Sequence, residues 1–267
     1  MNTAMTTAPV TVAVDANDIA AVTLDRADKH NAFDDVLIAE LTGIFSRLGG
    51  ESGVRAVVLA ANGKSFSAGA DINWMKRMAA APEAENVRDA RALAGMLRAL
   101  NDLPMPTLAL VHGAALGGGV GLAACCDIAI AADTATFALS EVRFGIIPAT
   151  IGPYVVAAIG ARQARRYFLT AERFGAAEAQ RIGLVHDVVP AAELRAVADR
   201  VLAGLAGNGP KAMAEAKALI RAIAGRPIDD ALIDDTARRI ARIRATDEAR
   251  EGLAAFLEKR KPSWSGI

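Results

Sequence analysis

The sequence predicts an α/β fold with an all-helical C-terminal region. In the first part of the chain, short apolar segments alternate with helical periodicities, and alternation of strand, helix and strand is typical of a parallel sheet with crossover helices. After Pro148 the pattern is almost wholly helical. The 267 residues suffice for one large domain with a sizeable core. We therefore expect an α/β core over residues 1–200 and a helical region over residues 201–267.

The expected strands are short segments rich in Val, Ile, Leu and Ala. They span residues 10–14, 19–24, 54–60, 107–111 and 128–132. The helices between them are expected at residues 34–48, near Ile72, at 84–101 and through the small residues that end at Cys126. The first helix carries its apolar residues on one face, as an amphipathic helix does: Val36, Ile38, Leu41, Ile44, Phe45 and Leu48.

The chain after Pro148 is expected to be almost wholly helical, and the tail after residue 200 is expected to contain no extended strand. These helices span residues 155–169, 176–182, 190–205, 210–224 and 229–259. The Ala, Leu and Ile faces of the final helices need a partner that shields them from water. We therefore expect the C-terminal region to pack on the core or on another subunit.

Composition excludes several classes of protein. Lysine plus arginine and aspartate plus glutamate number 30 each, so no net field attracts nucleic acid or an anionic membrane. Cys125 and Cys126 are adjacent and the three histidines are far apart, so neither a disulfide framework nor a metal site is expected. The N-terminus shows no secretory signal, and no apolar stretch is long enough to cross a bilayer. We expect a soluble, cytoplasmic protein without a metal.

The first motif that could carry chemistry is Ser65-Phe66-Ser67-Ala68-Gly69-Ala70-Asp71, between an expected strand and a helix. Gly69 at the bend allows the amide of Ala70 to point into a cleft from the start of the helix. Asp71 is a suitable N-cap for that helix. The alternative interpretation is an ordinary strand-to-helix turn with a cap.

The second motif is the glycine-rich start of another helix, Gly117-Gly118-Gly119-Val120-Gly121. Consecutive glycines there present bare backbone N–H groups to a ligand. A P-loop is excluded because no lysine follows at the required spacing, and the spacing also differs from a dinucleotide-binding fingerprint, although Glu141 lies 20 residues beyond Gly121. Close packing of the helix on the sheet is the alternative interpretation.

The third candidate is Glu141, an acidic residue in an otherwise apolar segment. Desolvation would raise its pKa and suit it to proton transfer. Alternatively, its carboxylate pairs with Arg143 or is exposed at a helix start. Two backbone amides and one such glutamate are the groups needed to stabilise an oxyanion and move a proton beside it.

In this order, the motifs resemble those of the enoyl-CoA hydratase/isomerase (crotonase) superfamily over nearly the whole chain. The matching blocks are DRADKHNAF, FSAGADI, HGAALGGGVGLAACCDIAIA, FALSEVRFGIIPATIGPYV, ARRYFLTAERFGAAEAQRIGLVHDVV and EGLAAFLEKRKPSW. The resemblance implies a crotonase-like spiral of repeated strand–helix units. It also implies an acyl-CoA substrate, with coenzyme A as part of that substrate and no separate cofactor, and a homotrimer that often stacks into a homohexamer.

The resemblance also implies roles for individual residues. The amides of Ala70 and Gly118 would form the oxyanion hole, and Glu141 matches the catalytic glutamate that exchanges a proton with a substrate carbon. The segments that bind coenzyme A correspond to Lys29–Ala32 and Ser67–Ala70, so Lys29, Ala32, Ser67 and Ala68 are expected to contact the substrate. Lys259 and Lys261 resemble the basic element that meets the phosphates of coenzyme A, often from a neighbouring subunit; a solvated charged tail is the alternative.

Gly121 departs from the pattern of the well-studied hydratases, which carry a second glutamate there that helps to hold one water. Single-glutamate relatives include Δ3,Δ2-enoyl-CoA isomerases, so isomerisation is one alternative and a non-catalytic CoA-binding protein is another. Several blocks, GGGVGL and SEVRFGIIPATIGPYVV among them, look most like bacterial hydratases of 3-methylglutaconyl-CoA in leucine or terpene breakdown. We expect an enoyl-CoA hydratase with a gap at Gly121 that fits a 3-methyl substrate, whose distal carboxylate would meet Arg143 if residues 141 and 143 share one face.

Overall fold

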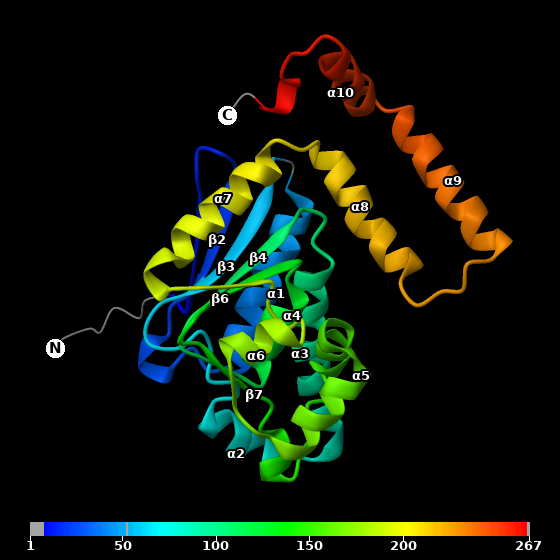
Figure 1. The fold of residues 1–267 in the computed structure, drawn as a ribbon. Helices are drawn as coiled ribbons and strands as arrows, with labels where there is room; N and C mark the ends of the chain where they lie inside the picture. The colour runs from blue at the N-terminus through cyan, green and yellow to red at the C-terminus, as the bar shows by residue number, and fades with distance from the viewer. Residues whose placement is uncertain (1–7, 52, 266–267) are drawn as a thin grey trace.

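The computed structural model describes residues 8–51 and 53–265 and contains two sheets (Figure 1). The larger sheet has the strand order β1-β2-β3-β4-β6-β9, with β1 antiparallel to β2 and every other neighbouring pair parallel. Its strands are β1 (Val10–Val14), β2 (Ile19–Leu24), β3 (Ala56–Ala61), β4 (Thr107–Val111), β6 (Ile128–Ala132) and β9 (Asp187–Val189). The smaller sheet has the order β5-β7-β8, formed by β5 (Ala114–Leu116), β7 (Thr136–Ala138) and β8 (Phe174–Gly175).

Helices cover both faces of the large sheet and form the C-terminal region. Those that precede the last strand are α1 (Asp35–Gly50), α2 (Ile72–Ala80), α3 (Glu83–Asn101), α4 (Gly118–Cys125), α5 (Gly152–Thr170) and α6 (Ala176–Arg181). Those that follow it are α7 (Leu194–Ala206), α8 (Pro210–Ile223), α9 (Asp230–Arg244) and α10 (Asp247–Leu257).

The central strands are apolar on both faces, as the strands of a buried parallel sheet are. Successive side chains of a strand point to opposite faces, so Val58 and Leu110 pack toward α7 whereas Val57 and Leu59 pack toward α1, α3 and α4. Figure 1 shows α7 alone on its side of the sheet. The larger apolar cluster lies between the sheet and the helices on its other side. The loops of the candidate site follow the carboxyl ends of β3 and β4.

Two expectations about secondary structure are wrong. Strands β5, β7, β8 and β9 were not expected, since each has only two or three residues and depends on a partner strand. The helix expected over residues 229–259 is two helices: α9 ends at Arg244, and Thr246 caps α10 by accepting a hydrogen bond from the Ala249 N–H. The division at residue 200 stays a prediction; α7 spans it, and the helices that leave the core begin with α8.

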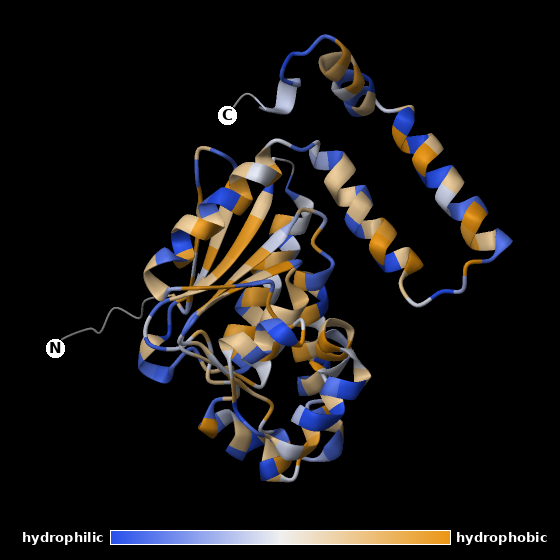
Figure 2. Ribbon diagram, viewed as in Figure 1, coloured by the Kyte–Doolittle hydropathy of each residue, from blue (hydrophilic) through white to orange (hydrophobic). Residues whose placement is uncertain are grey.

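Helices α8, α9 and α10 form an arm that projects from the core (Figure 1). Figure 2 shows that apolar and polar residues alternate along the arm. The arm exposes these large apolar side chains to solvent: Ile220, Ile223, Ile228, Ile233, Ile240, Leu253, Phe256 and Leu257. The end of the chain returns to the core, where the guanidinium of Arg55 donates to the carbonyl oxygens of Trp264 (2.7 Å) and Ala206 (2.8 Å). No helix within the described residues is long and apolar enough to cross a membrane.

Candidate active site

The segment after β3, residues 65–71, lies beside the segment that joins β4 to α4. The Ser67 N–H donates to the Ala114 carbonyl at 3.0 Å, and the Leu116 N–H donates to the Ser67 carbonyl at 2.9 Å. Phe66 is fully buried, so it anchors this segment in the core. These contacts bring the two motifs expected to present backbone amides side by side.

On its other side, the same segment pairs with the loop that precedes α1. The Phe33 N–H donates to the Gly69 carbonyl, and the Asp71 N–H donates to the Phe33 carbonyl, both at 2.7 Å. In such a parallel bridge the residue between the two bonded groups, here Ala70, directs its own N–H away from the partner strand. The Ala70 N–H accordingly has no hydrogen-bond acceptor among the described residues.

The second amide belongs to Gly118, the first residue of α4. As the first N–H of a helix it has no intrahelical acceptor. A Cβ on Gly118 would lie 2.9 Å from the ring of Phe33, and a Cβ on Gly69 would lie 3.0 Å from the Leu116 carbonyl oxygen. Glycine at both positions therefore allows close approach: Gly69 lies against the backbone of the other loop, and Gly118 lies against the ring of Phe33.

Glu141 lies next to these amides, at the start of a 3-10 turn (Glu141–Phe144) that follows β7. A Cβ on Gly117 would lie 2.9 Å from the Oε1 atom of Glu141, so the carboxylate rests against the residue before Gly118. Its Oε2 atom is buried and has no hydrogen-bond partner in the described part of the chain. Burial raises the pKa of Glu141, and a hydrogen bond from its own backbone N–H offsets part of this rise. The site therefore combines two available N–H donors with a carboxyl group suited to exchanging a proton.

A family model described as enoyl-CoA hydratase/isomerase matches residues 15–266. The chain belongs to this family. It is 35% identical over 250 residues to the short-chain-enoyl-CoA hydratase of Clostridium acetobutylicum, covering 91% of this chain and 92% of that protein. It is 31% identical over 247 residues to the 2,3-dehydroadipyl-CoA hydratase of Escherichia coli, covering 92% and 94%.

The crystal structure of an enoyl-CoA hydratase from Shewanella pealeana superposes on the chain with a TM-score of 0.93, at 45% sequence identity and with 96% of each chain covered. The crotonase fold and the enoyl-CoA hydratase class expected from the sequence are thereby confirmed.

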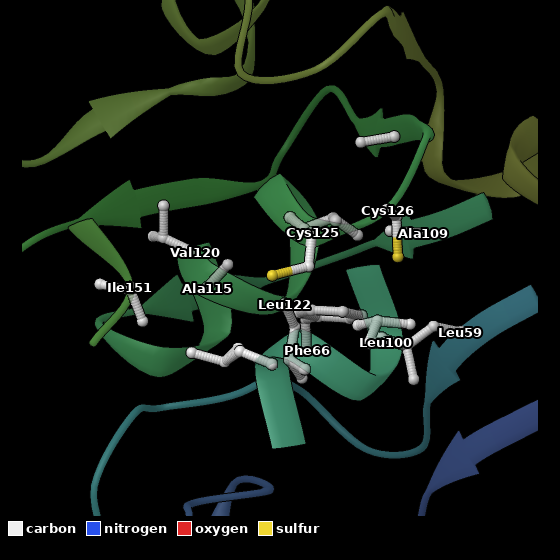
Figure 3. Packing of buried hydrophobic residues seen from close by; sticks show 14 of the residues in the cluster. Leu59, Phe66, Leu100, Ala109, Ala115, Val120, Leu122, Cys125, Cys126 and Ile151 are labelled. Carbon is white, nitrogen blue, oxygen red and sulfur yellow. The ribbon is translucent and has the colours of Figure 1, made fainter. Parts of the chain in front are cut away.

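Gly121 does not face an open gap in the hydratase fold. A Cβ on Gly121 would lie 2.9 Å from the Cβ of Ile151 and closer still to its Cγ2. Ile151 is 2% exposed, and Figure 3 shows it beside Val120 at one end of α4. The expected gap is therefore wrong: a side chain from the start of α5 fills it.

Arg143 is not aligned with Glu141. The two residues lie in a 3-10 turn, where residues two apart are about 120° apart around the axis, so they do not share a face. Arg143 is exposed, and no Glu141–Arg143 ion pair forms within the described residues. The alternative in which Arg143 neutralises Glu141 is therefore wrong.

The residues expected to contact coenzyme A differ in their exposure to solvent and in their place in the fold. Lys29 is exposed, with its Nζ 3.8 Å from Asp71 next to Ala70, and Ala68 is half-buried. Ala32 and Ser67 are buried, so their side chains are turned away from solvent. Lys259 and Lys261 are exposed at the end of α10, which Figure 1 shows well separated from α2 and α4. One chain does not bring these two lysines to Glu141.

Two further residues belong to the site, Phe33 and Asn31, for which no individual role was expected from the sequence. Both belong to the DRADKHNAF block, whose resemblance to the family was the available signal. Phe33 contacts both amide-bearing loops, and Asn31 is a fully buried polar residue behind them.

The cysteines lie at the end of α4 opposite to Ile151 (Figure 3), whereas Glu141 lies against Gly117, before the start of that helix. Cys125 and Cys126 are buried and unpaired, and burial raises the pKa of Cys126 to about 12. They are therefore protonated, unreactive core residues at neutral pH. Within the described ranges, no group of three or more His, Cys, Asp or Glu residues could hold a metal ion.

Proposed function

We propose that the protein hydrates the 2,3 double bond of an enoyl-CoA, with the amides of Ala70 and Gly118 as the oxyanion hole and Glu141 as the proton-transfer group. The observation that carries this proposal is the placement of the Glu141 carboxyl group, whose Oε2 atom is buried and has no partner within the described residues, beside the free N–H groups of Ala70 and Gly118. Family membership supports the same assignment.

The proposed reaction places negative charge on the thioester oxygen. Water adds at C3, an enolate forms, and its oxygen accepts hydrogen bonds from Ala70 and Gly118. Each such donor is worth about 3–4 kcal/mol of barrier, because its hydrogen bond strengthens as the charge develops. Glu141 accepts the proton that the attacking water gives up and donates it to C2, so that the elements of one water are added across the double bond. Its raised pKa brings the proton affinity of the carboxylate closer to that required near neutral pH.

Coenzyme A would approach along the exposed side of the same segment. Lys29 is suited to an anionic part of the ligand, and the half-buried Ala68 and the exposed Ala70 border it. Lys259 and Lys261 would complete the site from another copy of the chain in a homotrimer or a homohexamer, since the arm that bears them does not reach Glu141 within one chain. No separate cofactor is needed, and a cytoplasmic location is proposed.

We propose 3-methylglutaconyl-CoA as the substrate, on the resemblance of the motif blocks. The gap at Gly121 no longer supports this choice, because Ile151 fills it. We expect 3-methylglutaconyl-CoA to be hydrated with a kcat/KM at least tenfold above that of crotonyl-CoA, which corresponds to about 1.4 kcal/mol of discrimination. Crotonyl-CoA as the better substrate would contradict this choice while leaving the hydratase assignment intact.

Double-bond isomerisation is the second candidate, favoured by the single glutamate at the matched positions. Deuterium exchange at C2, followed together with the absorbance of the enoyl thioester, separates the candidates. A hydratase removes the conjugated absorbance of a 2-enoyl-CoA as water adds, whereas an isomerase generates it from a 3-enoyl-CoA. A non-catalytic CoA-binding protein changes neither signal, and that outcome would overturn the proposed function.

A further inference from the structure

We infer that Asn31 is a positioning residue that sets the direction of the Ala70 amide. This inference rests on the proposed oxyanion hole. Asn31 is a fully buried polar side chain, and its backbone has a φ of 54°, in the left-handed region. A buried amide is retained at low cost only where its donors and acceptor are all satisfied.

The side chain of Asn31 ties two loops together. Its Nδ2 donates to the carbonyl oxygens of Asn62 (2.9 Å) and Ser65 (2.8 Å), which lie in the segment leading from β3 into the site. Its Oδ1 accepts from the Arg26 N–H at 2.8 Å and so closes the turn that contains Asn31 itself. One planar amide therefore fixes the spacing between residues 26–33 and residues 62–71.

The backbone around Asn31 continues this connection up to Ala70. The Ser67 hydroxyl donates to the Asn31 carbonyl at 2.9 Å and accepts from the Gly69 N–H at 3.3 Å. The Ala68 N–H donates to the His30 carbonyl at 2.9 Å. Together with the two hydrogen bonds made by Phe33, these contacts constrain the residues on both sides of Ala70. A shift of Asn31 would therefore rotate or displace the Ala70 N–H.

Asparagine meets two requirements here that its nearest substitutes do not meet together. It adopts a positive φ more readily than most residues other than glycine. Its amide supplies the two donors and one acceptor that are used. Aspartate would direct a carboxylate at two carbonyl oxygens, and glycine would accept the φ but provide no side-chain hydrogen bonds.

The test compares Asn31→Asp and Asn31→Gly with Asn86→Asp. Asn86, in the first turn of α3, is a matched control because its Nδ2 also donates to two carbonyl oxygens, those of Met78 in α2 and of Ala81 just after it. Three quantities are measured: kcat and KM for an enoyl-CoA, the red shift of a bound aromatic enoyl-CoA whose absorption reports polarisation of its carbonyl, and hydrogen exchange of the peptide that contains Ala70.

For both Asn31 variants we expect kcat to fall at least tenfold while KM stays within threefold, because a misaligned donor weakens binding of the transition state rather than of the substrate. The red shift should decrease, and exchange at residues 66–72 should speed up. Asn86→Asp should retain the parent values. Two variants are used because Asn31→Gly avoids the buried carboxylate, which would hinder folding in Asn31→Asp.

An undiminished red shift in folded Asn31→Gly, or a kcat within threefold of the parent, would overturn the inference. A loss of activity that only follows the fraction of folded protein would also overturn it, since it would indicate a merely structural role. If the parent itself turns over no enoyl-CoA, the proposed function fails. Hydrogen exchange then tests the role of Asn31 by itself: an exchange rate at residues 66–72 that is the same in the Asn31 variants as in the parent would refute that role.

Discussion

Ile151 occupies the space that any side chain at Gly121 would need. A Cβ on Gly121 would lie 2.9 Å from the Cβ of Ile151, and both residues are buried. The contact connects the middle of α4 with the residue that precedes α5. Position 121 therefore lacks a second acid, and the side chain of Ile151 fills the space that such an acid would need.

Gly121→Glu should destabilise the protein by about 1–3 kcal/mol or more, because it overpacks the contact and buries a carboxylate. Adding Ile151→Ala should recover part of this loss by making room for the new side chain. The free energy of unfolding in urea, measured for both variants and for Ile151→Ala alone, tests the coupling. Additive effects of the two substitutions would show that the contact with Ile151 does not cause the loss of stability in Gly121→Glu.

Glu141→Gln should lower kcat by about 10²- to 10⁴-fold, the usual effect of removing a general acid or base. The shape of the side chain is kept, so affinity for coenzyme A should barely change. Stopped-flow or steady-state hydration assays, with calorimetric titration of coenzyme A, measure the two quantities. Turnover within threefold of the parent would remove Glu141 from the proposed mechanism.

The same variant should alter the pH dependence of stability. Because burial raises the pKa of Glu141 in the folded state, the unfolded chain ionises first as pH rises, and the parent loses stability until pH passes the folded pKa. Glu141→Gln lacks this loss, so its advantage should be absent in acid and increase to a plateau toward neutral pH. Urea unfolding over about pH 4 to pH 8 measures the difference. An advantage that shrinks with rising pH would contradict the assigned direction.

The arm should assemble copies of the chain into at least a trimer. Ile228, Phe256 and Leu257 are each more than three-quarters exposed, at 87%, 80% and 78%, which is unusual for large apolar side chains on one arm. Light scattering at micromolar concentration should report the trimer, and Phe256→Asp should weaken it. Val14→Asp, the same kind of change on the edge strand β1, serves as the control. A monomeric parent would refute this expectation.

Elements with their own apolar periodicity could be predicted from the sequence. The helix expected at 34–48 corresponds to α1, and the strand expected at 107–111 coincides with β4 (Thr107–Val111). Strand β8 has two residues, and its residue Phe174 pairs with Phe137 of β7 in space rather than in sequence. The break at Thr246 had a local signal, a threonine cap before two acids, which the continuous helical periodicity outweighed.

In the candidate site, too, features that depend on neighbouring residues could be predicted from the sequence, whereas contacts between distant segments could not. Gly69 and Gly117 have φ values of 85° and 48°, a backbone conformation that glycine signals within its own motif. The contact between Gly121 and Ile151 joins residues 30 positions apart, and nothing near either of them indicates it. The roles of Asn31 and Phe33 likewise depend on which loops the fold places beside them.

Both donors of the proposed oxyanion hole are main-chain groups. Side-chain exchange cannot delete an N–H, and among the twenty amino acids proline alone removes it. A lineage with this scaffold can therefore replace its acid, its cations and the walls around the acyl group without losing the means to stabilise negative charge. For laboratory evolution, this makes the side chains around Glu141 a tolerant region in which new specificities, or new reactions of the same enolate, can be selected without rebuilding the catalytic frame.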